Sequence, residues 1–83
     1  MVVDHDAPEP PYLQVAAILR GRIQAGQLPP GARVPSITAL MGEFGIARNT
    51  ARRAIEVLKD EDLVTVRQGW GTFVVRPGSA HEP

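Results

Sequence analysis

Residues 45–55, with the sequence GIARNTARRAI, gather side chains that can hydrogen-bond to nucleic acids into one short stretch. They are Arg48, Asn49, Thr50, Arg52 and Arg53. Arginine can donate two parallel hydrogen bonds to O6 and N7 of guanine, and asparagine can pair in a similar way with adenine. Because the free N–H groups and the dipole of a helix N-terminus favour an anion, these residues also suit a phosphate if they open a helix. The stretch therefore predicts a DNA-contacting surface, with a solvated basic helix face as the alternative.

The small apolar residues between these polar side chains predict a helix from Arg48 to Lys59 or Asp60. Its expected buried face consists of Ala51, Ala54, Ile55 and Leu58. Since successive residues of a helix are turned by about 100°, the opposite face carries Asn49, Arg52, Arg53 and Glu56. The two alanines allow a neighbouring helix to approach closely.

Two further helices are expected before the arginine-rich one. The first starts at Pro10 and Pro11, which suit a first helical turn, and ends near Gly26. Its apolar stripe is Tyr12, Val15, Ala16, Leu19 and Ile23. A turn at 28–32 and a very short strand at 33–34 precede Ser36, the expected N-cap of the second helix. That helix buries Ile37, Leu40, Met41 and Phe44, and residues 45–47 form the turn of a helix-turn-helix.

The last part of the chain predicts a β-hairpin. Residues 63–67 and 72–76 are rich in β-branched side chains, and the glycines of QGWG at 68–71 allow a tight connection. Beside a helix-turn-helix such a hairpin is a wing, and its expected tip residues are Arg67, Gln68, Gly69 and Trp70. Trp70 has two readings at this point. It packs into the core, or it lies on a sugar-phosphate surface or a partner chain.

Composition excludes several classes of protein. The 83 residues contain no cysteine, and His5 and His81 stand alone near the two ends, so we expect no metal site and no cofactor. The acidic residues at 60–62 are expected to form a solvated corner, and no nucleophile–base set or phosphate loop is present, so the chain is not expected to be an enzyme. No secretory signal or membrane span is expected either.

The fold class that follows is α+β, a winged helix-turn-helix of three helices with a small β-hairpin wing. The expected division is a flexible segment at 1–9, the DNA-binding domain at 10–76 and a flexible tail at 77–83. Net charge is zero, but the charges are segregated, because residues 33–53 carry four arginines against a single glutamate. This segregation matters more for a charged partner than the sum does.

Residues 11–75 resemble the DNA-binding domain of the GntR family of bacterial transcription regulators. The resemblance is carried by YLQVAAILRGRI, by G-x-LPPG-x-R-x-PS, by G-I-x-R-x-T-x-R-x-A-I and by L-V-x-V-RQG-x-GTFV, in that order. It implies a winged helix domain that binds short palindromic operators and usually represses transcription. It also implies a cytoplasmic, bacterial protein that is associated with the nucleoid when bound.

The resemblance implies roles for single residues. Arg48 and Arg52 match arginines of the recognition helix that contact bases and phosphates, and Thr50 matches a hydroxyl at the same helix start. Gly69 matches a wing glycine whose backbone lies along the minor groove. Arg33 matches a basic residue that contacts the DNA backbone, and Asn49 stands at a position that alters base preference. Beyond the resemblance, we expect Arg53 to contact the DNA backbone and Ser36 and Thr38, at the start of the second helix, to belong to the DNA-binding site.

Four positions depart from the family's pattern. Thr38 stands where an arginine is frequent, so a phosphate contact there is weakened. Ala47 replaces the usual Ser or Thr N-cap of the recognition helix, which costs about 1 kcal/mol. Asp62 stands where glycine is common, and a left-handed residue there is less comfortable. Trp70 occupies a wing position where a basic residue is frequent.

The expected partner is a double-stranded DNA operator, bound by a homodimer at least on the DNA. The chain ends soon after the wing, so no small-molecule effector domain is expected in it, and it reads as a stand-alone regulator or an excised domain. Two alternatives remain: a winged helix that docks on an acidic protein, and a domain that coats DNA without sequence preference. Sequence-dependent binding separates them from the leading interpretation.

Overall fold

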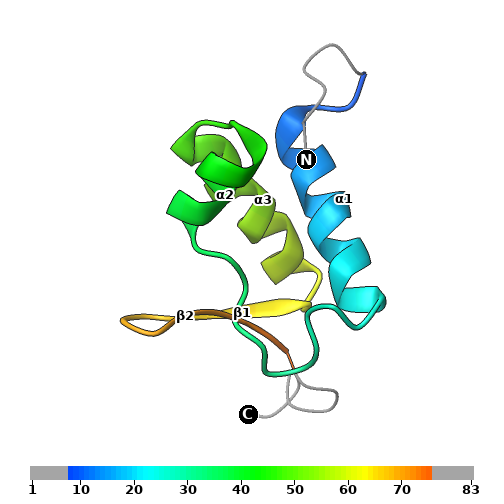
Figure 1. The fold of residues 1–83 in the computed structure, drawn as a ribbon, viewed down its shortest axis with the longest axis vertical. Helices are drawn as coiled ribbons and strands as arrows, with labels where there is room; N and C mark the ends of the chain where they lie inside the picture. Colours follow the sequence, from blue (N-terminus) through cyan, green and yellow to red (C-terminus); the bar gives the residue numbers. More distant parts are fainter. Residues whose placement is uncertain (1–7, 76–83) are drawn as a thin grey trace.

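The computed structural model describes residues 8–75, which form three helices followed by a β-hairpin (Figure 1). The elements are α1 (Pro11–Gln24), α2 (Ile37–Phe44), α3 (Arg48–Asp60), β1 (Val64–Arg67) and β2 (Gly71–Val74). Helices α1 and α2 both pack on α3, which also contacts β1. The predicted winged helix-turn-helix is therefore confirmed, with α3 at its centre. Residues 1–7 and 76–83, which include both histidines, most of the segment expected to be flexible at 1–9 and all of that at 77–83, lie outside the described residues.

The core is built from one face of each helix and from the inner residues of the hairpin. On α3 the buried residues are Ala51, Ala54, Ile55 and Leu58, which confirms the predicted face. The other buried residues are Val15, Ala16, Leu19, Val34, Leu40, Phe44, Ile46, Val64 and Val74. Within residues 8–75 no polar or charged residue is buried. Burial of apolar surface therefore holds the three helices and the hairpin together.

The predicted boundaries of α2 have the expected physical causes. Ser36 Oγ accepts a hydrogen bond of 3.1 Å from the Ala39 N–H, which satisfies one free donor of the first turn. Gly45 ends the helix with φ of 63°, a left-handed conformation that glycine adopts at little cost. The buried side chain of Ile46 then anchors the turn that leads into α3.

The C-terminus of α3 contains the strained residue that the sequence pointed to. Asp62 has φ of 60° and is the sole described non-glycine residue with a positive φ. The Asp62 N–H donates to the Lys59 carbonyl, and the Leu63 N–H donates to the Leu58 carbonyl, both at 3.0 Å. This is the hydrogen-bond pattern of a helix end that normally favours glycine, so Asp62 carries a local backbone cost of about 1–2 kcal/mol.

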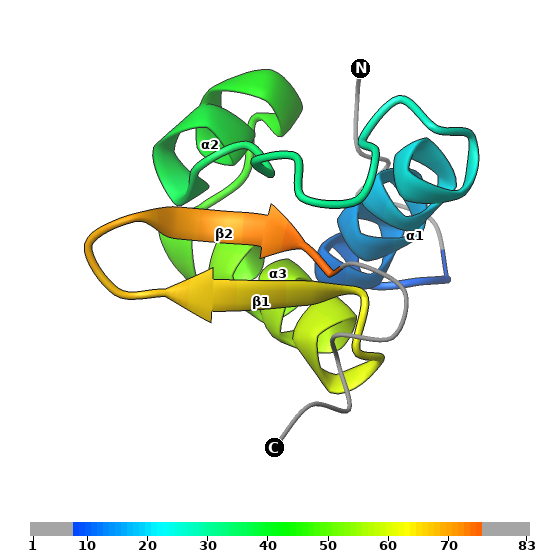
Figure 2. The same ribbon diagram turned by 90° about the horizontal axis from the view of Figure 1, so that it is seen from below.

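The wing is a two-stranded antiparallel hairpin with a three-residue loop at 68–70 (Figure 2). Val64 pairs with Val74 at its base, and Arg67 pairs with Gly71 at its end. Gly71 therefore belongs to β2. The sequence pattern had placed it in the connection at 68–71, and that bound is wrong by one residue.

The prediction of a very short strand at 33–34 is wrong, because an isolated β-bridge takes its place. Arg33 makes a single β-bridge with Phe73, because the chain bends away at Pro35 after the Val34 N–H has donated to the Thr72 carbonyl.

Two ion pairs fasten α1 to the rest of the domain. Arg20 donates from Nε and Nη2 to the two carboxylate oxygens of Glu61, at 2.8 and 2.7 Å. Arg22 pairs with Glu43 of α2, and its guanidinium lies 5.7 Å from the ring centroid of Phe44. Residues 60–62 are thus more than a solvated corner, since Glu61 has a specific partner 41 positions away. Local sequence patterns do not indicate such a pairing.

The Arg20–Glu61 pair makes stability depend on pH. The hydrogen bonds from Arg20 hold the pKa of Glu61 below its ordinary value of 4.5. A depressed carboxyl pKa adds stability above the unfolded pKa, and this contribution is lost as the pH falls through the folded pKa. We therefore expect Glu61→Gln to lower the free energy of unfolding at pH 7, with a difference from wild type that vanishes as the pH falls well below 4.5.

Urea denaturation at a series of pH values measures this difference. Glu56→Gln is the matched control, since Glu56 is exposed and has no ion pair among the described residues. A Glu61→Gln deficit that persists unchanged at low pH would assign it to packing and not to the ion pair.

Candidate nucleic-acid interface

The N-terminal half of α3 exposes the polar residues that the sequence singled out. Arg48, Asn49, Arg52 and Arg53 are exposed, and Thr50 is half-buried. They project from α3 because the opposite face of the helix is committed to the core. The turn at 45–47 sets the direction of this half of the helix relative to α2.

The charge at the start of α3 runs against the helix dipole. The first turn has Arg48 and no acidic residue, while the last turn carries Lys59 together with Asp60. A cation at a helix N-terminus is unfavourable by about 0.3–1 kcal/mol. Ala47 adds to this, because it has the extended backbone of an N-cap but no side chain that accepts a hydrogen bond. The helix start thus combines positive charge with N–H donors that lack a side-chain acceptor, and an anionic ligand would complement both.

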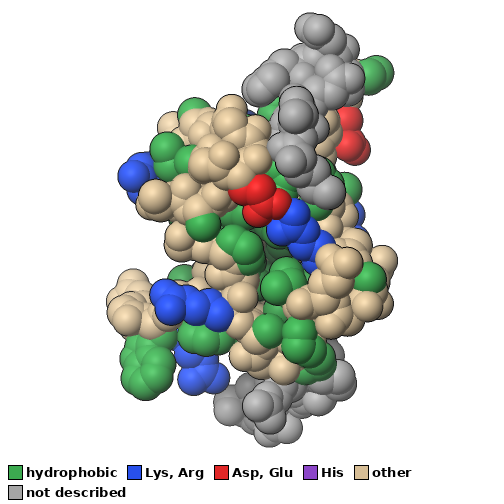
Figure 3. Space-filling model, in the orientation of Figure 1, with side chains coloured by type: hydrophobic (Ala, Val, Ile, Leu, Met, Phe, Trp, Pro, Cys, Tyr) green, Lys and Arg blue, Asp and Glu red, His purple; other side chains and the backbone are tan. Residues whose placement is uncertain are grey.

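Most of the described arginines have no carboxylate partner. Within residues 8–75, ion pairs engage the two arginines of α1 and leave those of α3, of the wing and of the segment before α2 unpaired. The unpaired arginines are Arg33, Arg48, Arg52, Arg53 and Arg67, and all of them are exposed. Figure 3 shows Lys and Arg side chains at the edge where the hairpin projects, with no Asp or Glu beside them in this view. Exposed, unpaired cations suit a polyanion.

The wing tip is fully accessible. Arg67, Gln68, Gly69 and Trp70 are all exposed. Trp70 is 72% exposed, so the interpretation of Trp70 as a core residue is wrong. The reason is its place in the loop beyond the last strand pair, where no helix covers it. Trp70 therefore presents its ring to solvent or to a ligand.

Gly71 provides the space that Arg33 occupies at the base of the wing tip. A Cβ at position 71 would lie 3.0 Å from Nε and 3.2 Å from Nη2 of Arg33. The backbone of Gly71 also has φ of 118°, which side chains rarely tolerate. The Arg33 side chain, which comes from the segment before α2, thus lies against the wing at Gly71. The sequence pattern assigned this glycine to a tight connection and did not indicate that Arg33 approaches it.

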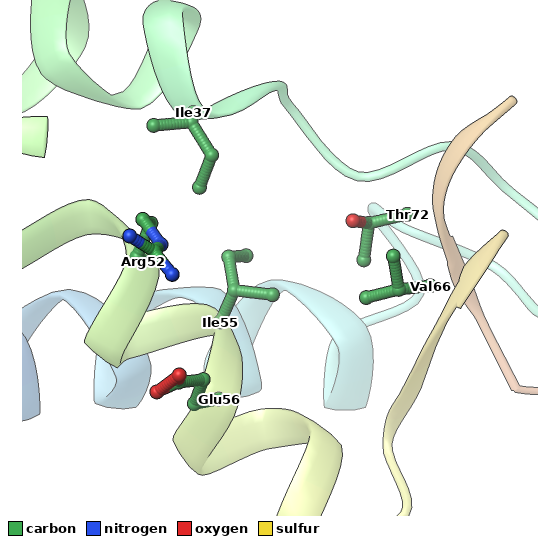
Figure 4. A pocket seen from close by; sticks show the side chains of 6 residues that line it. All are labelled: Ile37, Arg52, Ile55, Glu56, Val66 and Thr72. Atoms are coloured by element: carbon green, nitrogen blue, oxygen red, sulfur yellow. The ribbon is translucent and has the colours of Figure 1, made fainter. Parts of the chain in front are cut away.

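A shallow hollow separates the recognition face of α3 from the wing. It has a volume of about 290 Å³ and is lined by Ile37, Arg52, Ile55, Glu56, Val66 and Thr72. Figure 4 shows Arg52 on one side of the hollow and the wing residues Val66 and Thr72 on the other, with Ile55 between them. Val66 is 48% exposed, so the apolar floor of the hollow continues onto the wing. Arg52 therefore faces the wing across an open, largely apolar surface.

Arg53 makes a contact that sequence reasoning missed. Its guanidinium carbon lies 4.1 Å from the ring centroid of Tyr12 on α1. Tyr12 was expected in the buried stripe of the first helix, and it is in fact half-buried. Periodicity places a residue on a face, but it does not reveal which side chain of another helix will cover it.

The two candidates at the start of α2 have different positions. Ser36 is exposed, and its hydroxyl caps the helix, while Thr38 is exposed in the first turn. Both lie next to the segment that carries Arg33. Within residues 8–75 no three His, Asp or Glu side chains are arranged to hold a metal ion, and no helix there is long and apolar enough to cross a membrane. The site is thus one of exposed hydrogen-bond donors and cations.

A helix-turn-helix with a wing, and with unpaired arginines on the second helix of the motif, defines the class of winged helix domains of regulatory proteins. The model of bacterial regulatory proteins of the gntR family matches residues 11–74. The chain belongs to the gntR family. This confirms the resemblance seen in the sequence.

Relatives with assigned roles share the whole described domain. The histidine utilization repressor of Pseudomonas aeruginosa is 39% identical over 72 residues, which are 87% of this chain and 29% of the repressor. The HTH-type transcriptional regulator Rv1152 of Mycobacterium tuberculosis is 38% identical over 74 residues, which are 89% of this chain and 61% of the regulator. The chain therefore spans only part of the length of these relatives.

Solved structures have the same fold. The DNA-binding domain (DBD) of AraR in complex with operator ORX1 superimposes with a TM-score of 0.84 and 34% identity, over 90% of this chain and 95% of that one. YtrA from Sulfolobus acidocaldarius, a GntR-family transcription factor, gives a TM-score of 0.82 and 30% identity, over 89% and 78% of the two chains. The winged helix fold is thus shared along nearly the whole described domain.

The uncapped start of α3 predicts a stabilising substitution. Ala47 has φ of −73° and ψ of 160°, so a serine there can accept a hydrogen bond from the N–H of Thr50 without backbone change. We expect Ala47→Ser to raise the free energy of unfolding by about 1 kcal/mol, measured by urea denaturation. The control is Ala17→Ser on the exposed side of α1, which should lower it by about 0.5 kcal/mol. Equal effects at the two positions would contradict a capping role.

The close approach of Arg33 to Gly71 predicts a destabilising substitution. We expect Gly71→Ala to lower the free energy of unfolding by about 1–3 kcal/mol, because it combines an unfavourable φ with the approach to Arg33. Gly69→Ala is the control, since position 69 has φ of 81° and no atom near a new Cβ. Arg33→Ala in the Gly71→Ala background should recover the part due to the close approach. No recovery would leave the backbone conformation as the sole cause.

Proposed function

We propose that this chain binds double-stranded DNA in a sequence-dependent manner and regulates transcription, as a repressor at a short palindromic operator. The observation that carries the proposal is the set of unpaired arginines on α3, on the wing and at position 33, whereas the two arginines of α1 are held in ion pairs within residues 8–75. Membership of the gntR family supports it, as does the likeness to the AraR domain in complex with operator ORX1. The role is one of binding, and no catalysis is assigned to the chain.

In the proposed complex the N-terminal half of α3 enters the major groove. Arg48, Asn49, Thr50 and Arg52 read base edges and nearby phosphates, and Arg52 does so from the rim of the hollow beside the wing. Arg53, Arg33, Ser36 and Thr38 contact the DNA backbone and fix the register. Arg67, Gln68, Gly69 and Trp70 form the tip that meets the adjacent minor groove. Gly69, with φ of 81° and open space around it, allows the backbone to approach the DNA closely.

Two copies are proposed to bind one palindromic operator. A single module of this size offers few base contacts, so two half-sites are needed for tight, selective binding. We further propose that the chain acts in the bacterial cytoplasm and is associated with the nucleoid when it is bound. Any response to a small molecule would come from outside the described residues.

Selection of duplexes from a random DNA pool at moderate salt tests the proposal. Enrichment of a short palindrome, with half-sites about one helical turn apart, is the expected result. A folded chain that enriches no sequence but binds all duplexes would instead be a non-specific DNA binder. A chain that binds no duplex would favour docking on an acidic protein, with Trp70 as an anchor.

The rim position of Arg52 predicts a change in specificity. Arg52→Ala should weaken binding to the selected duplex by about 1–3 kcal/mol and relax the base preference at one position of each half-site. Lys59→Ala is the control, because it removes a charge from the other end of α3 and should leave the preferred sequence unchanged. Titrations against duplexes substituted at single positions measure both effects. An unchanged base preference in Arg52→Ala would remove Arg52 from the reading residues.

A further inference from the structure

The contact between Tyr12 and Arg53 joins the first helix to the face proposed to bind DNA. The guanidinium carbon of Arg53 lies 4.1 Å from the centre of the Tyr12 ring, within the range of a cation–π interaction. Arg53 is nevertheless exposed, and within residues 8–75 it has no carboxylate partner. Its charge is therefore held in place without being neutralised.

The second arginine that lies over an aromatic ring is held differently. Arg22 lies 5.7 Å from the ring of Phe44, and it is also paired with Glu43. That arginine serves the fold, because its charge is already met by a carboxylate. The stack on Tyr12 uses only one flat face of Arg53 and leaves the N–H groups in the guanidinium plane able to donate. Of the two stacked arginines, Arg53 is thus the one arranged for an external anion.

The neighbouring residues Arg52 and Arg53 lie on different flanks of the exposed face of α3. Arg52 lines the hollow beside the wing residues Val66 and Thr72, while Arg53 lies against α1. A side chain that faces the wing is directed along the major groove, whose base edges α3 is proposed to contact. A side chain on the α1 side lies at the flank of the helix, where a phosphate is the part of a duplex within reach.

We propose that Tyr12 is a positioning residue, which holds the Arg53 guanidinium in the orientation that receives a phosphate of the DNA backbone. This rests on the proposed function, and it adds a residue of α1 that does not itself touch DNA. An arginine side chain loses rotamer freedom when it becomes fixed on a ligand. Because the stack has already restricted Arg53 in the free protein, less freedom is lost on binding.

A double-mutant cycle tests this assignment. The proteins are wild type, Tyr12→Leu, Arg53→Gln and the double variant, with Tyr12→Phe as the conservative change that keeps the ring. Lys59→Gln is the matched charge control at the far end of α3. Binding is titrated as a function of salt with two probes, a palindromic duplex enriched by the wild-type chain and a duplex of scrambled sequence. Urea denaturation of each variant establishes that it is folded.

We expect Tyr12→Leu to weaken binding to both probes by about two- to fivefold, the range of a cation–π contact at an exposed site. Arg53→Gln should weaken binding to both and reduce the salt slope by about 1. The double variant should bind no more weakly than Arg53→Gln alone. Tyr12→Phe and Lys59→Gln should keep the wild-type affinity to within about twofold.

Two results would overturn the assignment. If Tyr12→Leu weakens binding by the same factor with Arg53 and with Gln at position 53, Tyr12 acts on the fold alone. If Tyr12→Phe binds as weakly as Tyr12→Leu, the hydroxyl is the important group and not the ring. A structural role alone would lower stability in both backgrounds, but it would not produce the coupling in DNA affinity.

Failure of the proposed function is recognised separately. If no palindrome is enriched, sequence-specific regulation fails, yet the cycle on the scrambled duplex still decides the role of Tyr12, because a phosphate contact is independent of sequence. If no duplex is bound at all, both proposals are overturned. A measurement without DNA checks the stack itself: the side-chain methylene protons of Arg53 should show ring-current shifts in wild type and Tyr12→Phe that are lost in Tyr12→Leu. Their absence in wild type would contradict the positioning role.

Discussion

Ala51 and Ala54 have no exposed surface, and the helix that carries them packs against α1, α2 and β1. Small side chains at these positions let α3 lie deep in the domain. A larger residue would have to displace a neighbouring helix, at about 1–3 kcal/mol. Once this face is buried, the period of the helix fixes which residues point outward. The arginines of α3 are therefore exposed because the alanines fill the opposite, buried face.

Charge is distributed according to role. The arginines of α1 form ion pairs with Glu43 and Glu61, which attach that helix to the C-terminal ends of α2 and α3. The arginines of α3 and the wing have no such partners among the described residues. One of them, Arg48, lies in the first turn of α3, where the helix dipole disfavours a positive charge. A cation at a helix start lowers stability when no acidic group of the same domain lies beside it. Such a cation is expected where an anionic ligand binds.

The parts that could be predicted from the sequence depend on local chemistry. The buried face of α3, the Ser36 cap and the end of α2 before Gly45 all follow from residues within a few positions of one another. The hairpin was predicted too, but the bounds of its strands differ from the observed ones by one or two residues. β-branched residues indicate that a strand is present, but they do not indicate where it ends.

The errors concern contacts between distant segments. The partner of Glu61 is 41 positions away, and Arg53 lies on a ring of another helix. Arg33 makes a bridge in place of a strand, since its pairing depends on β2 and ends at Pro35. Trp70 is exposed because of where the hairpin ends, whereas the sequence left both burial and exposure open. Side-chain partners of this kind are settled by tertiary packing, which periodicity does not encode.

The backbone between α1 and α2 has a mechanical consequence for the wing. Gly31 and Val34 donate hydrogen bonds to Val74 and Thr72, and Val74 donates to Ala32, at 2.7 to 2.9 Å. These bonds join the base of the hairpin to the segment that leads into α2, so the base cannot swing without moving that helix. The three-residue loop at 68–70 lies beyond the last strand pair and has no such bonds to the segment before α2. The hydrogen bonds therefore tie the spacing between α2 and the base of the wing to the backbone, and they leave the tip the least restrained part of the hairpin.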